Sequence, residues 1–516
     1  MVLLRSIATV GIFTMMSRFL GFVRDILIAG ILGAGPVADA FFVAFKLPNF
    51  FRRLFAEGAF SAAFIPLFTR HMSESGRSAA RDFAQEVMSV FVVGLLFLVT
   101  VLQIAMPWIM HGFAPGFGND PLRFRLAVEM AQITFPYLLF ISLVSQLGGV
   151  LNAVGKFAAS AAAPIILNLC LIAALLGLSG FVETSGHALA WGVATAGAAQ
   201  FIWLIVACYR IDFQIRFLRP RLTPRVKRLL VLMLPGAIGA GVVQINLLID
   251  VVIASLLPRG SISFLYYADR VTQLPLGVIG VAVGTALLPL LSRQLRLADD
   301  NSAMGSMNRA MEFALLLTLP SAAALMTIPD EIISVLFERG AFGAAETGAT
   351  AAALAAYSVG LPAYVLIKVL SPGFFAREDT VTPVRIAAIC VATNVGLNLF
   401  LMGPFLHVGI ALATAISAWM NAALLLIILR RRGFLTVDAR LRRAFPRIVL
   451  ASVIMAAIVG LSAEYLTDFA GRDDLLRALS LVTLIVIGLV GFAFAAILFG
   501  ASRISDFKRM LDRSSR

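Results

Sequence analysis

The stretch from Ala63 to Arg70 reads A-F-I-P-L-F-T-R, and 223 positions later the stretch from Ala286 to Arg293 reads A-L-L-P-L-L-S-R. The match extends along the chain at the same offset, because 186–190 (G-H-A-L-A) falls on 409–413 (G-I-A-L-A). Matching segments at a fixed spacing indicate an internal repeat. We therefore expect two related halves.

The composition indicates that this repeat folds in a membrane. Of the 516 residues, 60% are hydrophobic and 14% are charged, whereas soluble domains average about 45 to 50% and about 25%. A bilayer core of about 30 Å requires roughly 20 helical residues, and apolar runs of that length recur between short polar connections. The sequence therefore predicts an all-α polytopic membrane protein.

Hydropathy, charge and Gly/Pro punctuation divide the chain into about fourteen predicted transmembrane spans. Their centres lie near residues 20, 52, 98, 138, 168, 198, 240, 277, 321, 360, 393, 420, 455 and 488.

The repeat groups these spans into lobes. Spans one to six and seven to twelve form the two copies, and both copies begin on the same side of the membrane because six is even. We predict an N-terminal lobe at 1–222 and a C-terminal lobe at 223–433 around a central cavity, with spans thirteen and fourteen and a tail at 434–516. This arrangement suits alternating access. A static scaffold is the alternative.

Basic residues are distributed unevenly between the connections. About 25 Lys and Arg lie in one set, and about six lie in the alternate set. Positive connections face the cytoplasm, so we expect both termini there, together with 69–84, 209–228, 293–309 and 430–447. Topology thus accounts for the net charge of +14 without a nucleic-acid partner.

Charged residues also lie inside the predicted spans: Arg18, Arg24, Asp25, Asp39, Lys46, Arg52, Arg53, Glu57, Asp250, Asp269, Arg270 and Lys368. A charge at the centre of a membrane helix costs about 2.5 to 3.5 kcal/mol on insertion scales, so these side chains should face a partner or a wet cavity. Spans one, two, seven and eight contain most of them. We expect these four spans to line the cavity.

Three arginines are the strongest candidates for binding an anion. Arg24, Arg52 and Arg270 have no partner at local spacing apart from the sequence neighbours Asp25 and Asp269. Arginine forks bind phosphate oxygens bidentately, so arginines inside a cavity suit a pyrophosphate group.

Other charges have structural alternatives. Arg18 and Asp25 lie on one helical face, and Arg53 and Glu57 have the spacing of an ion pair. Snorkelling to the interface is the alternative for Arg18 and Lys368.

A cation site is the second prediction. Asp250 is a lone acid in an apolar run, and Asn394, Asn398 and Thr414 offer neutral oxygens. This set suits a sodium ion, and ordinary interhelical hydrogen bonding is the alternative.

No enzyme signature is found. The four histidines have no metal-ligand spacing, no P-loop lysine motif occurs, and the three cysteines lie in apolar segments without the spacing of a zinc site. We expect a transporter without a cofactor, driven by an ion gradient such as Na+, by membrane potential or by substrate flux.

Three stretches resemble one family: S-R-F-L-G-F-V-R-D at Ser17 to Asp25, A-D-A-F-F-V-A-F-K-L-P-N-F-F-R-R-L-F-A-E-G-A-F-S at Ala38 to Ser61, and L-F-E-R-G-A-F at Leu336 to Phe342. They are similar to the MurJ (MviN) family of lipid II flippases, within the multidrug/oligosaccharidyl-lipid/polysaccharide exporter superfamily. The resemblance covers the whole chain, including the two additional C-terminal spans.

The resemblance implies export of lipid II, an undecaprenyl-pyrophosphate-linked disaccharide pentapeptide, across the bacterial cytoplasmic (inner) membrane for peptidoglycan synthesis. It also implies that spans thirteen and fourteen form a lipid-facing groove. The family's functional residues correspond to Arg18, Arg24, Asp25, Asp39, Arg52 and Arg270. Some members have a sodium site at the positions of Asp250, Asn394, Asn398 and Thr414, although an acid replaces Asn398 there.

Lipid II and membrane lipids are the expected partners, and a monomer is the expected state. A flippase for another polyprenyl-linked glycan and a multidrug antiporter of the same superfamily are the alternatives. An arginine-rich cavity disfavours the cationic cargo of a drug antiporter.

Overall fold

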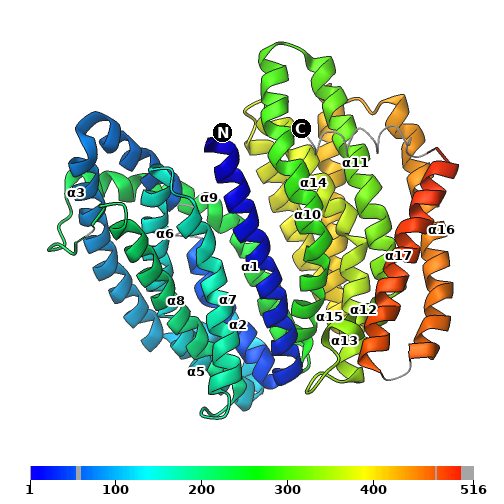
Figure 1. The fold of residues 1–516 in the computed structure, drawn as a ribbon, viewed down its shortest axis with the longest axis horizontal. Helices are drawn as coiled ribbons and strands as arrows, with labels where there is room; N and C mark the ends of the chain where they lie inside the picture. The colour runs from blue at the N-terminus through cyan, green and yellow to red at the C-terminus, as the bar shows by residue number, and fades with distance from the viewer. Residues whose placement is uncertain (1, 54–59, 215, 471–472, 501–516) are drawn as a thin grey trace. The chain divides into compact units, whose positions relative to one another are not determined.

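The computed structural model describes residues 2–53, 60–214, 216–470 and 473–500. Within these ranges every regular element is a helix, and a single isolated bridge joins Arg339 to Phe342 (Figure 1). The prediction of an all-α chain is confirmed. Contacts group the chain into unit 1, Met1–Ser263 with Arg339–Phe342, and unit 2, Phe264–Glu338 with Gly343–Arg516.

The described helices have the length and hydropathy of membrane spans. In this part of the chain, nine helical segments are long and apolar enough to cross a bilayer, with mean hydropathy from 1.5 to 2.8. The chain is therefore a polytopic membrane protein. The count of fourteen spans and the two six-helix lobes stay predictions.

Unit 1 begins with the helices α1 and α2 and continues to α9. Their bounds are α1 Val2–Leu32, α2 Pro36–Phe51, α3 Ser61–Ile104, α4 Met106–Phe113, the 3-10 helix η2 Pro115–Asn119, α5 Pro121–Thr134, α6 Tyr137–Ala153, α7 Ala158–Leu178, α8 Ser185–Tyr209 and α9 Pro224–Ser255.

Side-chain caps fix several of these helix starts. Asp120, Thr184 and Thr223 each accept a hydrogen bond from a backbone N–H in the first turn of α5, α8 and α9. Such caps satisfy amide groups that have no partner within the helix.

Unit 2 contains the helices from α10 onward. Their bounds are α10 Ser261–Arg296, whose first three residues belong to unit 1, α11 Asp300–Thr327, α12 Pro329–Phe337, α13 Ala344–Val359, α14 Leu361–Phe375, α15 Val381–Arg431, α16 Ala439–Ala470 and α17 Asp474–Leu498.

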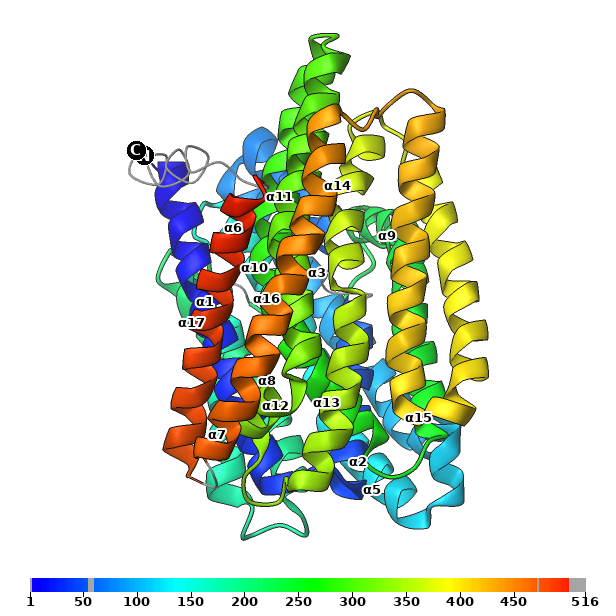
Figure 2. The same cartoon turned by 90° about the vertical axis from the view of Figure 1, so that its right-hand side faces the viewer.

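Two long helices each combine segments that the sequence assigns to different spans. Non-helical backbone at Gly76 (φ 82°) divides α3, and non-helical backbone at Leu406 (φ 50°) divides α15. The two arms of α15 lie side by side in Figure 2. The predicted spans eleven and twelve therefore correspond to the two arms of α15.

Each unit packs around its own apolar core. In unit 1, Phe60, Phe64, Phe68 and Phe83 form a stacked aromatic cluster between the two arms of α3. In unit 2, α16 packs against α11 and α17 packs against α12. The two helices outside the repeat are thus attached to the side of unit 2.

Several predicted connections are helical. For example, 293–309 is occupied by the end of α10 and the start of α11 with a break of three residues. Hydropathy marks only the apolar part of a helix, whereas backbone hydrogen bonds continue beyond the bilayer.

Helix α9, the first predicted span of the C-terminal lobe, packs against α3, α4 and η2 and belongs to unit 1. The lobes at 1–222 and 223–433 were defined by the repeat and not by packing, and they stay a prediction.

Candidate functional site

The most buried of the predicted cationic residues is Arg24 in α1. Its side chain donates to Asp25 Oδ1 through Nε at 3.0 Å and through Nη2 at 2.7 Å. It also donates through Nη1 to Asn168 Oδ1 of α7 at 2.9 Å. Arg24 is 6% exposed and Asp25 is 2% exposed. The guanidinium is therefore held in one orientation by a carboxylate and an amide.

Asn168 is a site residue that sequence reasoning missed. Its amide nitrogen donates to the Ser17 carbonyl at 2.9 Å, so it links α7 to the α1 backbone. Asn168 packs over Gly21, where a Cβ would make an ordinary van der Waals contact with its side chain at 3.4 Å. The available signal was a lone amide in the otherwise apolar α7.

The other predicted anion-binding arginines are bonded to neutral neighbours on their own helices. Arg52 donates through Nε to Asn49 Oδ1 at 3.1 Å. In unit 2, Arg270 donates through Nη2 to the Tyr266 hydroxyl at 3.0 Å, and its guanidinium carbon lies 4.8 Å from the centre of that ring. Sequence reasoning considered carboxylate partners only and therefore missed both contacts.

The remaining predicted charges differ in exposure. Arg18 and Lys46 are exposed, and Asp25 bonds to Arg24 and not to Arg18 in the contacts described here. The predicted pair of Arg53 and Glu57 lies outside the described residues, because Glu57 is not among them.

Asp39, in the first turn of α2, is fully buried. Its Oδ2 accepts from the Gly260 N–H at 2.7 Å, and its Oδ1 accepts from the Ser263 N–H at 3.0 Å and the Ser263 hydroxyl at 2.7 Å. Because these amides precede and begin α10, the carboxylate caps the start of that helix. The arrangement makes Asp39 a structural acceptor, and its predicted contact with substrate stays a prediction.

Arg123 connects this cap to a second buried carboxylate, Asp120, which Arg259 also contacts. Arg123 lies 3.7 Å from Asp39 and 3.0 Å from Asp120, and Arg259 lies 2.7 Å from Asp120. The Arg259 guanidinium, together with the backbone N–H of Arg123, holds the pKa of Asp120 below its usual range. The four side chains form one ionic network in unit 1, in which Asp39, Arg123 and Asp120 are buried and Arg259 is exposed.

The L-F-E-R-G-A-F motif places its last four residues in unit 1. The Ala341 N–H donates to the Gly30 carbonyl at 2.8 Å, next to the end of α1. Gly340 (φ 58°) and Gly33 (φ 66°) both have left-handed backbone at this contact. The motif thus has a packing role against α1.

The predicted cation-site residues are divided between the units. Asp250 lies in unit 1, whereas Asn394, Asn398 and Thr414 lie on the two arms of α15 in unit 2. Asn394 accepts from the Ser417 hydroxyl at 3.5 Å, and the Thr414 hydroxyl donates to the Ile410 carbonyl at 2.9 Å. A cation site at these positions stays a prediction.

One group of possible metal ligands occurs among the described residues. Ligand atoms of Glu129, Glu183 and His187 lie within 4.8 Å of one another. Arg125 bonds to both glutamates, at 3.3 and 2.7 Å, and holds the pKa of Glu183 below its usual range. This guanidinium already supplies the positive charge that a metal ion would bring.

The apolar helices and the buried ionic contacts define the class of protein. The chain is a polytopic α-helical membrane protein that has arginine–carboxylate contacts buried within unit 1. The model of the family described as lipid II flippase MurJ matches residues 28–498. The chain belongs to this family.

Curated relatives match along almost their entire length. A protein of Rhizobium meliloti (strain 1021), named probable lipid II flippase MurJ, is 46% identical over 100% of this chain and 97% of its own length. One of Burkholderia cenocepacia, named lipid II flippase MurJ, is 35% identical over 98% of each chain.

The chain also matches solved structures, one of the same family and others that share its fold. A structure described as lipid II flippase MurJ in an inward closed conformation matches with a TM-score of 0.79 and 29% identity, covering 95% of this chain and 98% of that one. An inward-facing multidrug transporter of the MATE family matches with a TM-score of 0.67 at 15% identity, covering 82% and 97%. The second match shows a shared fold alone.

Proposed function

We propose that this chain moves lipid II from the inner to the outer leaflet of the bacterial cytoplasmic membrane for peptidoglycan synthesis. The observation that carries the proposal is full-length identity of 35 to 46% with proteins named as lipid II flippases. A shared fold alone does not define a function, and the MATE-family match at 15% identity is of that kind.

The arginines suit the pyrophosphate of this substrate. In our proposal Arg24, Arg52 and Arg270 bind its oxygens, because guanidinium groups form paired, charge-assisted hydrogen bonds with phosphate. Arg24 and Arg270 are held by Asn168 and Tyr266, respectively. Such prior orientation lowers the entropy lost on binding. Arg18, Asp25 and Asp39 are proposed to support the same site.

Asp25 competes with the substrate for Arg24. Its carboxylate neutralises the guanidinium in the absence of an anion, which lowers the cost of burying that charge. A phosphate oxygen that binds Arg24 replaces Asp25 as the acceptor. We propose that substrate binding thereby releases the Asp25 carboxylate from Arg24.

The polyprenyl tail of the substrate must stay in lipid, and we propose that it lies against α17. Large apolar side chains of this helix are exposed in a row: Leu475, Leu479, Val482, Val486, Leu489 and Phe494. Figure 1 shows α17 beside α16 within unit 2. An apolar tail can lie against this surface without loss of hydrogen bonds.

We further propose fourteen spans in two six-helix lobes plus α16 and α17, both termini in the cytoplasm, a monomeric state and alternating access. Return of the empty protein uses membrane potential or a cation at Asp250, Asn394, Asn398 and Thr414. Each elementary charge that crosses the field contributes about 2.3 kcal/mol per 100 mV.

The arginine proposal is tested in cells depleted of the chromosomal protein. Plasmids supply wild type, Arg24→Ala, Arg52→Ala, Arg270→Ala or the control Arg70→Ala, which removes an exposed ion pair with Glu74. Growth and membrane abundance of each variant are measured together. We expect normal growth with Arg70→Ala and none with the other three at equal abundance. Full growth with all three variants would remove these arginines from the mechanism.

A further inference from the structure

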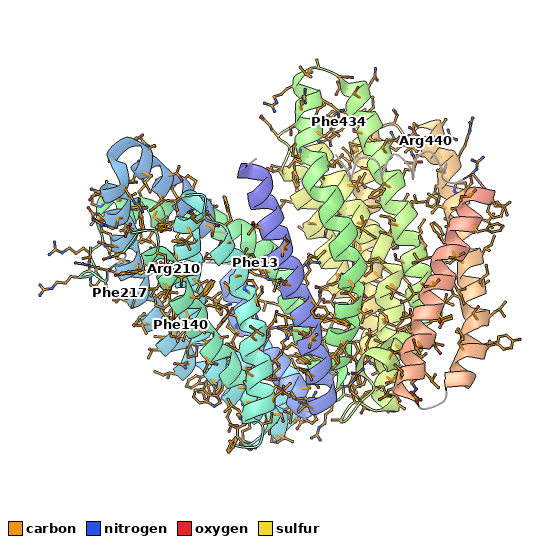
Figure 3. The ribbon with its side chains drawn as sticks, in the orientation of Figure 1. Phe13, Phe140, Arg210, Phe217, Phe434 and Arg440 are labelled. Carbon is orange, nitrogen blue, oxygen red and sulfur yellow. The ribbon has the colours of Figure 1, made fainter. Side chains whose placement is uncertain are left out.

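Unit 1 contains a cavity of about 590 Å³ that the proposed transport does not use. It lies between α1, the connection from α6 to α7, and the end of α8. Phe13 of α1 and Arg210 at the end of α8 are labelled in Figure 3. The volume is within the range of about 300 to 1,000 Å³ that is typical of small-molecule sites.

The cavity has an apolar wall with an aromatic anchor. Phe13, Leu151, Trp203 and Val206 line it. The Trp203 indole donates to the Ala159 carbonyl at 3.1 Å, so the ring is held beside the first turn of α7. Tryptophan in this setting is typical of the membrane interface, where lipid headgroups meet acyl chains.

Two cations, Lys156 and Arg210, line the same cavity. Neither side chain has an ion-pair partner among the residues that the structure describes. Cations at helix C-termini also compensate the helix dipole. Compensation of the helix dipole would not require an apolar cavity between the two cations.

The backbone fixes the positions of both cations. Gly155 has φ 76°, and the Lys156 N–H donates to the Leu151 carbonyl at 2.8 Å, which ends α6 in a tight turn. At the end of α8, the Arg210 N–H donates to the Val206 carbonyl at 3.0 Å. Left-handed glycine after a helix is the usual form of such an end. The backbone at both cationic residues is therefore fixed before any ligand binds.

We infer that this cavity is a binding site for an anionic phospholipid of the bilayer. The phosphate accepts hydrogen bonds from Lys156 and Arg210, and one acyl chain lies along Phe13, Leu151 and Trp203. Charge complementarity selects the headgroup, because basic pockets between membrane helices bind anionic lipid headgroups. The apolar wall selects a lipid over a free anion.

Quenching of Trp203 fluorescence by brominated lipid tests this inference. A chain with Trp108, Trp191 and Trp419 replaced by Phe retains Trp203 as its single tryptophan. It is reconstituted in bilayers that contain equal small fractions of brominated phosphatidylglycerol or brominated phosphatidylcholine. One cation near a membrane surface contributes about fivefold in affinity. We expect phosphatidylglycerol to be enriched about fivefold or more at Trp203.

Trp419 provides a matched control within the same chain. Its indole donates to the Val359 carbonyl at 2.9 Å, and it is 37% exposed compared with 42% for Trp203. A chain with Trp419 alone should be quenched equally by the two lipids. The double substitution Lys156→Gln and Arg210→Gln should abolish the preference at Trp203 and leave Trp419 unchanged.

Three results would overturn the assignment. Equal quenching of Trp203 by both lipids would show that no anionic lipid is selected. A preference that survives the double substitution would place the lipid elsewhere. Loss of the preference in excess inorganic phosphate would identify a site for the free anion. None of these readouts depends on transport of lipid II.

Discussion

Arg24 donates two hydrogen bonds to one carboxylate oxygen of Asp25, the next residue in the chain, at 3.0 and 2.7 Å. Side chains of consecutive residues do not face each other on a regular helix. The Arg24 side chain must therefore curve round α1 to reach Asp25, and Asn168 holds its other branch at 2.9 Å. The positive charge of Arg24 is neutralised and oriented at the same time.

Replacing Asp25 tests the strength of this buried pair. Asp25→Asn leaves the Arg24 charge without its carboxylate in a site that is 6% exposed. Breaking a buried pair on one side costs about 3 to 5 kcal/mol. We expect a lower midpoint of thermal unfolding in detergent. Glu74→Gln, which breaks the exposed pair with Arg70, should cost less than about 1 kcal/mol. Equal stability of the two variants would contradict this account.

Asp39 provides a second stability test at the start of α10. Asp39→Ala removes the acceptor of three hydrogen bonds and the charge facing Arg123, so we expect a loss of about 3 to 5 kcal/mol. Ser263→Ala removes only the hydroxyl bond and should cost about 1 kcal/mol. Chemical denaturation of the purified variants measures both. A larger effect for Ser263→Ala than for Asp39→Ala would contradict the cap.

The sequence predicted features that depend on neighbouring residues and missed contacts between residues that are far apart in the chain. Apolar runs predicted helices correctly because hydropathy is a local property of the chain. Asn168 lies 144 positions from Arg24, so no local spacing could pair them. The cap on α10 likewise joins Asp39 to Ser263, and a capping motif read from one segment cannot show it. A break between spans eleven and twelve was predicted, but the positive φ of Leu406 was not, because a non-glycine residue with positive φ has no simple sequence signal.

The connection between α14 and α15 should respond to acid through Asp379. Its carboxylate accepts from the Thr382 hydroxyl at 2.6 Å, from the Thr382 N–H at 2.9 Å and from Arg432 at 2.6 Å. These bonds lower the pKa of Asp379 to about 2. Because the folded pKa is depressed, its stabilisation is present above the ordinary pKa of about 3.9 and is lost as the pH falls towards 2.

The corresponding measurement compares wild type with Asp379→Asn by thermal unfolding at two pH values. Near pH 6 we expect wild type to be more stable, and near pH 2.5 we expect the difference to shrink. A difference that grows on acidification would reverse the sign and contradict the assignment.

Gly340 tests the packing of its motif against α1. It has φ 58°, and a Cβ there would clash with the Gly30 carbonyl oxygen. Gly340→Ala should therefore destabilise the protein by more than the roughly 1 to 2 kcal/mol of left-handed backbone strain. Gly348→Ala, in an exposed turn of α13 with open space around it, should be neutral or stabilising by up to about 1 kcal/mol. Matching effects at the two glycines, measured as unfolding midpoints, would show that no such clash occurs.

The proposed function is movement of lipid II between the leaflets. The most direct measurement is the fraction of lipid II that an externally added lipid II-cleaving enzyme reaches in cells depleted of the protein, with and without a plasmid that expresses wild type. We expect depletion to remove the accessible fraction while total lipid II persists, and we expect wild type to restore it. Undiminished access after depletion would show that this chain does not move lipid II between the leaflets.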